Sequence, residues 1–188
     1  MKKKSLIFIG GVIILIGVGV ALLAHNQQPV NTNQSSTSKS SVQVLPVSNN
    51  PIQNTSSQPG IAITNVQVEN NTDPVTGSPV NDRLQFAVQN SSSQTAQNLS
   101  VYYTLTDVKS KQSESYYQKL TGLSVAPGQS TNIFLDNGTG TGHYPENKYS
   151  IYHTSTNPLS ISLEVSAQNF KPVSTLVQKG AGTGDNKD

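Results

Sequence analysis

The chain has 188 residues, of which only 12% are charged and none is cysteine, a length that allows one ordinary domain beside tails and linkers. The absence of cysteine excludes disulfides, thiolate zinc sites, a cysteine nucleophile and the lipidated cysteine of a bacterial lipoprotein. The formal net charge is +2, but outside Lys2, Lys3 and Lys4 the chain carries 9 basic and 10 acidic residues, so no nucleic-acid-binding surface is expected.

An apolar segment at residues 6–24 predicts a transmembrane helix. Its 19 residues include no charged or polar side chain, and as a helix they would rise about 28 Å, close to the hydrocarbon thickness of a bilayer. Three lysines precede the segment and the next lysine or arginine is Lys39, which predicts a cytoplasmic N-terminus. We therefore expect residues 1–4 in the cytoplasm, a single-pass signal anchor at 5–24, and the rest outside the cytoplasm. A cleaved signal peptide is the alternative, and it also exports the domain.

Residues 25–60 have the composition of a disordered linker. They are rich in Asn, Gln, Ser, Thr and Pro, and Lys39 is their only formal charge. Little apolar surface is available to offset the ordering of the backbone. A short apolar patch at residues 42–47 could form an extra edge strand or no structure, and Pro46 favours the second reading.

Residues 61–171 predict a β-domain, because apolar and polar residues alternate in short blocks separated by Gly, Pro and Asn. Strands are expected at 61–68, 84–88, 99–105, 115–120, 130–135, 148–153 and 159–167. In the first block the alternation changes phase around Thr64 and Asn65, which predicts a bulge or two short strands. The expected fold class is all-β: a single immunoglobulin-like antiparallel β-sandwich, preceded by the transmembrane helix and the linker. Residues 172–188 are expected to form a disordered C-terminal tail.

Three stretches resemble a known domain family: FAVQNS at 86–91, NLSVYYTLTD at 98–107, and LSVAPGQS at 123–130. They resemble the FxLYD domain and related cell-adhesion-type sandwich repeats of prokaryotic surface proteins, over about residues 61–136. The Leu-Tyr-Asp of that family reads Leu105-Thr106-Asp107 here, and the glycine that usually follows is absent. The resemblance implies an extracytoplasmic binding or spacer module and no catalytic residues.

The sequence offers no convincing catalytic, cofactor or metal site. Residues 36–39 match an S-x-x-K pattern, but the other motifs of penicillin-recognising enzymes are missing. His143 and His153 could share a metal with Asp136 or Glu146, yet two histidines separated by nine residues match no ligand spacing. We therefore expect neither an enzyme nor a bound cofactor or metal.

Tyrosines are the remaining candidates for a binding surface, because exposed rings on a sandwich face can stack on sugars or anchor a protein partner. Alternation places Tyr103 inward and Tyr102 outward, and we expect Tyr102 and Tyr152 to contact a partner. The predicted function is that of a membrane-anchored extracytoplasmic module that binds a protein or glycan at the cell envelope. The alternative is a structural or assembly subunit, or a spacer, of a membrane complex with no ligand of its own.

Overall fold

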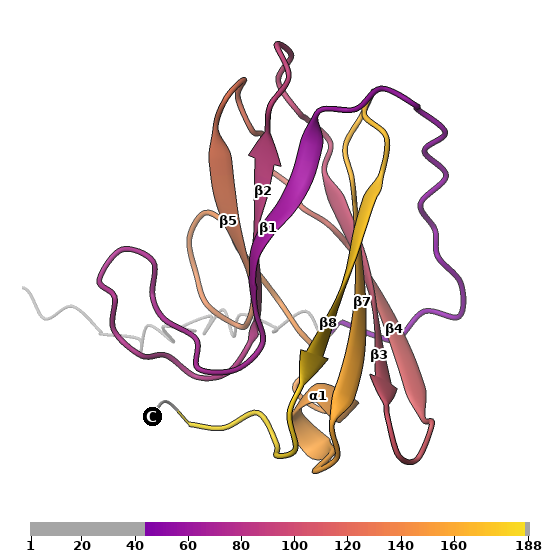
Figure 1. The fold of residues 1–188 in the computed structure, drawn as a ribbon, viewed down its shortest axis with the longest axis vertical. Coiled ribbons are helices and arrows are strands. Elements are labelled where there is room, and N and C mark those ends of the chain that lie inside the picture. Colours follow the sequence, from indigo (N-terminus) through magenta and orange to yellow (C-terminus); the bar gives the residue numbers. More distant parts are fainter. Residues whose placement is uncertain (1–43, 187–188) are drawn as a thin grey trace, which may run out of the picture. The chain divides into compact units, whose positions relative to one another are not determined.

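The computed structural model describes residues 44–186, which are almost entirely strand and loop (Figure 1). Its strands are β1 (Ile61–Gln67), β2 (Leu84–Asn90), β3 (Ser100–Asp107), β4 (Ser113–Lys119), β5 (Ser130–Leu135), β6 (His143–Tyr144), β7 (Leu159–Ser166) and β8 (Val173–Lys179). The described residues also contain one short helix, α1 (Ile151–Thr154). The all-β prediction is confirmed. No helix within 44–186 is long and apolar enough to cross a membrane, and the expected transmembrane segment at 5–24 lies outside this range.

The strands form two four-stranded sheets, with the orders β1-β2-β5-β6 and β4-β3-β7-β8. Adjacent strands are antiparallel except β5 and β6, which are parallel. Figure 1 shows the sheets as two layers, and one hydrophobic core takes side chains from both, among them Phe86, Val88, Ile133, Val101, Leu105, Ile161 and Leu163. Because successive side chains of a strand point to opposite faces, the alternating sequence gives each sheet one apolar face.

The irregularity predicted in the first strand is confirmed. The pairing of β1 with β2 shifts register between Thr64 and Gln67. Asn65 lies inside the shift with a φ of 51°, a left-handed conformation that Asn tolerates better than most residues. The local change of phase in the hydrophobic pattern therefore marks a bulge in a single strand.

The strand predicted at 148–153 is wrong, because α1 occupies its second half. Ile151 and Tyr152 are adjacent and both buried, which a strand with one buried face does not allow. The carbonyl of Ser150 accepts the backbone N–H of Thr154 at 3.1 Å and its hydroxyl at 2.9 Å, which closes the helical turn.

The end of the domain lies later than the sequence predicts. The expected disordered tail at 172–188 contains β8, which pairs with β7 from Val173 to Lys179. Val173 and Val177 pack against the core, whereas Thr175 stands between them. This pattern has too few apolar residues to predict a strand, and pairing with β7 supplies the backbone hydrogen bonds that stabilise it.

Residues 44–60, which we call the strap, also differ from the predicted linker. The strap forms no strand, but it is hydrogen-bonded to the outer face of the β4-β3-β7-β8 sheet and leads into β1 (indigo to purple in Figure 1). The N–H of Val47 donates to the carbonyl of Ser115 on β4 at 2.8 Å, and the amide of Asn50 donates to Glu164 on β7 at 2.9 Å.

Asn54 attaches the second half of the strap. Its amide donates to Ser166 Oγ at 2.9 Å and to the carbonyls of Ala167 and Phe170, both at 2.8 Å. The strap is therefore held by amide and backbone hydrogen bonds, which a search for apolar periodicity cannot detect, and by Val44 of the apolar patch at 42–47, which is buried in the core. The predicted linker at 25–60 is corrected for this half, and residues 25–43 lie outside the described range.

Asn90 joins three segments at the end of β2, although its side chain is fully buried. Its amide donates to the carbonyls of Gln94 at 2.7 Å and Val125 at 2.8 Å. Its Oδ1 accepts the backbone N–H of Ser92 at 3.0 Å and the Ser92 hydroxyl at 2.7 Å. One side chain thus fixes both the loop after β2 and the turn before β5.

Asp107 has a similar role at the end of β3, where it is 4% exposed. Its carboxylate accepts the hydroxyl of Ser155 at 2.6 Å, the amide of Asn157 at 2.9 Å, and the backbone N–H groups of Lys109 and Ser110 at 2.9 and 2.8 Å. These donors, the Ser155 hydroxyl first, hold the pKa of the carboxyl well below its ordinary value. Asp107 therefore ties the β3–β4 turn to the segment that precedes β7.

Candidate functional site

Tyr152 is not available to a partner. It is 3% exposed, and its hydroxyl donates a hydrogen bond to the carbonyl of Val68. Burial raises the pKa of this hydroxyl well above its ordinary value, so it remains a neutral donor. The expectation that Tyr152 contacts a partner is corrected: the strand predicted at 148–153 would have exposed one face, whereas α1 turns the ring into the core.

Tyr102 lies on the outer face of its sheet, as alternation predicts, and is half-buried. It pairs across the strands with Tyr117 on β4 and with Glu164 on β7. The strap is bonded to Glu164, which belongs to this row, and to the carbonyl of Ser115, two residues from Tyr117 on β4. The face that carries Tyr102 is therefore shared with the strap, and Tyr152 does not join it.

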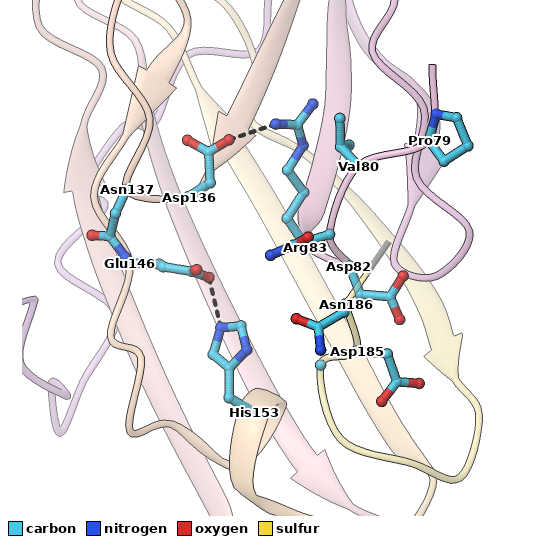
Figure 2. A pocket seen from close by; sticks show the side chains of 12 residues that line it. Pro79, Val80, Asp82, Arg83, Asp136, Asn137, Glu146, His153, Asp185 and Asn186 are labelled. Carbon is cyan, nitrogen blue, oxygen red and sulfur yellow. Dashed lines mark hydrogen bonds and ion pairs between the residues drawn. The ribbon is translucent and has the colours of Figure 1, made fainter. Parts of the chain in front are cut away.

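A cleft of about 650 Å³ lies where the segment before β2, the segment after β5, α1 and the C-terminal residues meet (Figure 2). It is lined by residues 79–83, Asp136, Asn137, Glu146, His153 and residues 184–186. Its size falls within the range of small-ligand sites. Four of the lining residues are acidic, namely Asp82, Asp136, Glu146 and Asp185, against the single guanidinium of Arg83. Burial raises the pKa of Asp82, although the N–H of Asn70 donates to its carboxylate.

Asp136 is the centre of a packed polar cluster on one wall of the cleft. Arg83 Nη1 donates to Asp136 Oδ2 at 2.6 Å, and His143 Nδ1 lies 2.9 Å from Oδ1. The N–H of Gly138 also donates to Oδ1 at 2.9 Å. Beneath the cluster, the ring of Phe134 contacts the Arg83 guanidinium at 4.4 Å and stacks on His143 at 4.6 Å. These contacts fix the charged groups before any ligand arrives.

A second hollow of about 360 Å³ shares Arg83 with the first and is also lined by Phe134 and His143. Its lining includes residues 73–75 of the loop between β1 and β2, and residues 130–132 of β5. Val75 at the tip of that loop is 91% exposed. Arg83 thus stands between the two hollows, and one ligand could contact both.

His153 and Glu146 form a second acid–base pair in the cleft, shown with a dashed line in Figure 2. His153 Nε2 lies 3.0 Å from Glu146 Oε2, but the N–H direction is not aligned for a good hydrogen bond. The imidazole packs edge-on against Tyr152 at 4.9 Å. The structure therefore separates the four residues considered for a metal into two pairs, His143 with Asp136 and His153 with Glu146. Among residues 44–186, no three His, Asp or Glu side chains are placed to hold one ion.

Sequence reasoning missed Arg83, Asp82 and the C-terminal residues of this site. Arg83 is the only arginine of the chain and immediately precedes a buried strand, which was an available signal. Asp82 and Asp185 lie in segments that show no periodicity, and only the fold brings them together at the cleft.

Comparison with known proteins does not assign the chain to a family. No family model matches the sequence, and no curated protein does. A crystal structure of a Bordetella pertussis protein to which the name ApaA is given is similar at 15% identity, over 66% of this chain and 97% of that one, with a TM-score of 0.35. A similarity of this degree carries no argument about fold or function, and the resemblance to the FxLYD domain stays a prediction.

Proposed function

We propose that this chain is a membrane-anchored extracytoplasmic module of immunoglobulin-like β-sandwich fold, which binds a protein or glycan at the cell envelope through the cleft around Asp136. The apolar segment at 6–24 and the preceding lysines support the anchor and its orientation. Two sheets that share one core are what such a sandwich requires.

The observation that carries the binding site is the fixed set of charges in the cleft. The side chains of Arg83, Asp136 and Glu146 are 10%, 16% and 15% exposed, so each is held by packing and yet reaches the cleft. Groups that are already ordered lose little conformational freedom when a ligand binds. The other candidate surface, around Tyr102, is shared with the strap.

The charge and lining of the cleft favour a basic protein segment as the ligand. Four carboxylates against one guanidinium attract cationic groups. The lining includes no Phe, Tyr or Trp, so the ring stacking that neutral sugars commonly use is not offered there. A glycan without cationic groups would therefore gain less from this cleft than a segment rich in lysine or arginine.

Site-specific crosslinking in the source cells tests this proposal. A photoreactive residue at Asn137, which is exposed and lines the cleft, should capture a specific envelope protein. A photoreactive residue placed instead at Thr55, which is exposed on the strap, is the control and should not capture that protein. Asp136→Asn should weaken capture from Asn137. Equal capture from both positions, or no effect of Asp136→Asn, would count against the cleft as the binding surface.

The absence of cysteine permits a clean test of the topology. A single cysteine introduced as Thr55→Cys should react with a membrane-impermeant maleimide in intact cells, whereas one introduced as Lys3→Cys should react only after lysis. The reverse pattern would refute the extracytoplasmic placement.

A rigid spacer or assembly subunit is the second candidate function. The strap and the buried polar residues Asn90 and Asp107 favour it, because they stiffen the loops and the chain's entry to the domain. This function would be supported if every crosslink reached only membrane-embedded neighbours. It would be rejected if an unrelated transmembrane helix could replace residues 5–24 without loss of complex formation.

A further inference from the structure

The last described residues of the chain, 180–186, lie across one side of the cleft and we call them the flap. Gly184, Asp185 and Asn186 are part of the cleft lining. In Figure 2, Asp185 and Asn186 stand on the same side of the cleft as Asp82, facing the wall that carries Asp136. The flap directly follows β8, an edge strand of its sheet.

Few bonds hold the flap. The N–H of Gly180 donates to Glu69 Oε1 at 3.0 Å, and the N–H of Gly182 donates to the carbonyl of Thr156 at 3.2 Å. The buried Lys179 donates from Nζ to the carbonyl of Gly182 at 2.9 Å. The two bonds from backbone N–H groups contribute about 1 kcal/mol each, and the bond from the charged, buried Lys179 about 1.5–3 kcal/mol. All three are made by residues 179–182, so residues 183–186 can move without breaking them and without unfolding the sheets.

The flap covers His153 at close range. A Cβ added to Gly184 would overlap the Nδ1 atom of His153, so the chain passes over the imidazole where only glycine fits. Glycines at 180, 182 and 184 alternate with other residues, and Gly182 has a φ of +129°. Glycine loses more conformational freedom on ordering than any other residue, which favours an open flap whenever its few contacts are lost.

The charges also lower the free-energy cost of opening the flap when no ligand is bound. Asp185 places a carboxylate near Asp82, and their repulsion contributes to the raised pKa of Asp82. A cationic group between them would remove this repulsion and bring the Asp185 carboxylate into contact with the ligand.

We propose that residues 180–186 are a lid on the cleft, which opens at its glycines to admit a cationic ligand and closes on it with Asp185. This inference rests on the proposed binding function, and it adds how the ligand enters the cleft. The closed lid covers His153 and leaves His143, on the other side of Asp136, uncovered by the flap.

Chemical modification of the histidines tests the lid without any ligand. The full-length protein in detergent is treated with diethylpyrocarbonate, and the modification of each histidine is followed by peptide mass spectrometry. A variant that ends after Gly182 should show His153 reacting about tenfold faster than in the intact protein, with His143 unchanged. A variant that ends after Asn186 is the matched control and should behave like the intact protein. Gly184→Ala in the full-length chain should also speed the reaction of His153.

Two results would overturn the lid. If His153 reacts at the same rate in both truncations, the flap does not cover it. If His143 accelerates together with His153, the flap is a structural part of the fold rather than a lid. Because the assay uses no ligand, a failed lid leaves the crosslinking test of the cleft standing, and a failed crosslink leaves the lid standing.

Discussion

Replacing Asn90 by alanine should destabilise the domain far more than its small change in volume suggests. The side chain makes four hydrogen bonds, two as donor to the carbonyls of Gln94 and Val125 and two as acceptor from Ser92. Each contributes about 0.5–1.5 kcal/mol net. The Val125 carbonyl keeps the N–H of Ala96. The single proton of the Ser92 hydroxyl, no longer shared with Asn90, is free to go to the Gln94 carbonyl 2.9 Å away, so neither carbonyl is left without a partner. We therefore expect Asn90→Ala to lower the free energy of unfolding by about 2–4 kcal/mol.

Urea denaturation measures this change, followed by tyrosine fluorescence because the chain has seven tyrosines and no tryptophan. In thermal denaturation, the Tm of Asn90→Ala should be about 6–12 °C below that of the wild type, for a domain of this size. Gln89→Ala, one residue earlier and exposed, is the matched control and should change stability by less than about 0.5 kcal/mol. A loss of less than about 1 kcal/mol for Asn90→Ala would refute the network argument.

Asn90→Asp distinguishes hydrogen bonding from packing, because the two side chains have nearly the same shape. At neutral pH the new carboxylate would face the carbonyls of Gln94 and Val125 with no proton to donate, so this variant should be less stable than Asn90→Ala. Burial and these carbonyls would raise the folded-state pKa of the new carboxyl. Its deficit relative to the wild type should therefore shrink as the pH falls through that pKa. A deficit independent of pH would contradict the assignment of donor and acceptor.

Three further variants test other parts of the fold. The pKa of Asp107 is lowered in the folded state, so its contribution to stability is present above its ordinary pKa of 3.8 and is lost as the pH falls further. In urea denaturation, the loss of unfolding free energy caused by Asp107→Asn should therefore be largest near neutral pH and become smaller below pH 3.8. Asn54→Ala should accelerate hydrogen exchange in the strap while β3 and β7 stay protected, and Thr55→Ala, whose side chain is exposed, should leave the strap unchanged. Gly142→Ala should destabilise the domain by about 2 kcal/mol or more in thermal denaturation. Gly142 has a φ of +88°, and a Cβ added there would lie 2.6 Å from a backbone oxygen of β5. Gly77→Ala is the control and should destabilise the domain less, because Gly77 has a φ of +69° but open space around it.

The sequence predicted most of the strands because each has a clear apolar face. The alternation at β3 and β7 and the change of phase at Thr64 were all visible in the hydrophobic pattern. The strap, which the sequence analysis missed, is held mainly by polar groups. The strap depends on amides of Asn50 and Asn54 that meet partners more than a hundred residues away, and no local pattern records such a meeting.

The candidate site was predicted only in fragments. His143, Asp136, His153 and Glu146 stood out as chemically capable residues, but their spacing could not show that they form two separate pairs. Their partners at the cleft come from segments that the pattern treated as loop or tail. Tyr152 was wrongly expected at the surface. In a strand, the neighbour of the buried Ile151 would point outward, but the helical turn of α1 buries both residues.

Under tension, the strap can detach from the domain and lengthen the chain that precedes it. A pulling force applied through the N-terminal side of the chain would reach residues 44–60 before any strand of the two sheets. The strap's few side-chain bonds should then give way one after another, at forces well below those that separate paired strands. Seventeen residues span at most about 60 Å when fully extended, so their release would lengthen the tether by that length less the distance that the strap already covers, while both sheets and the cleft stay folded. Such a module could keep hold of a partner while the distance between the partner and the point of pull changes.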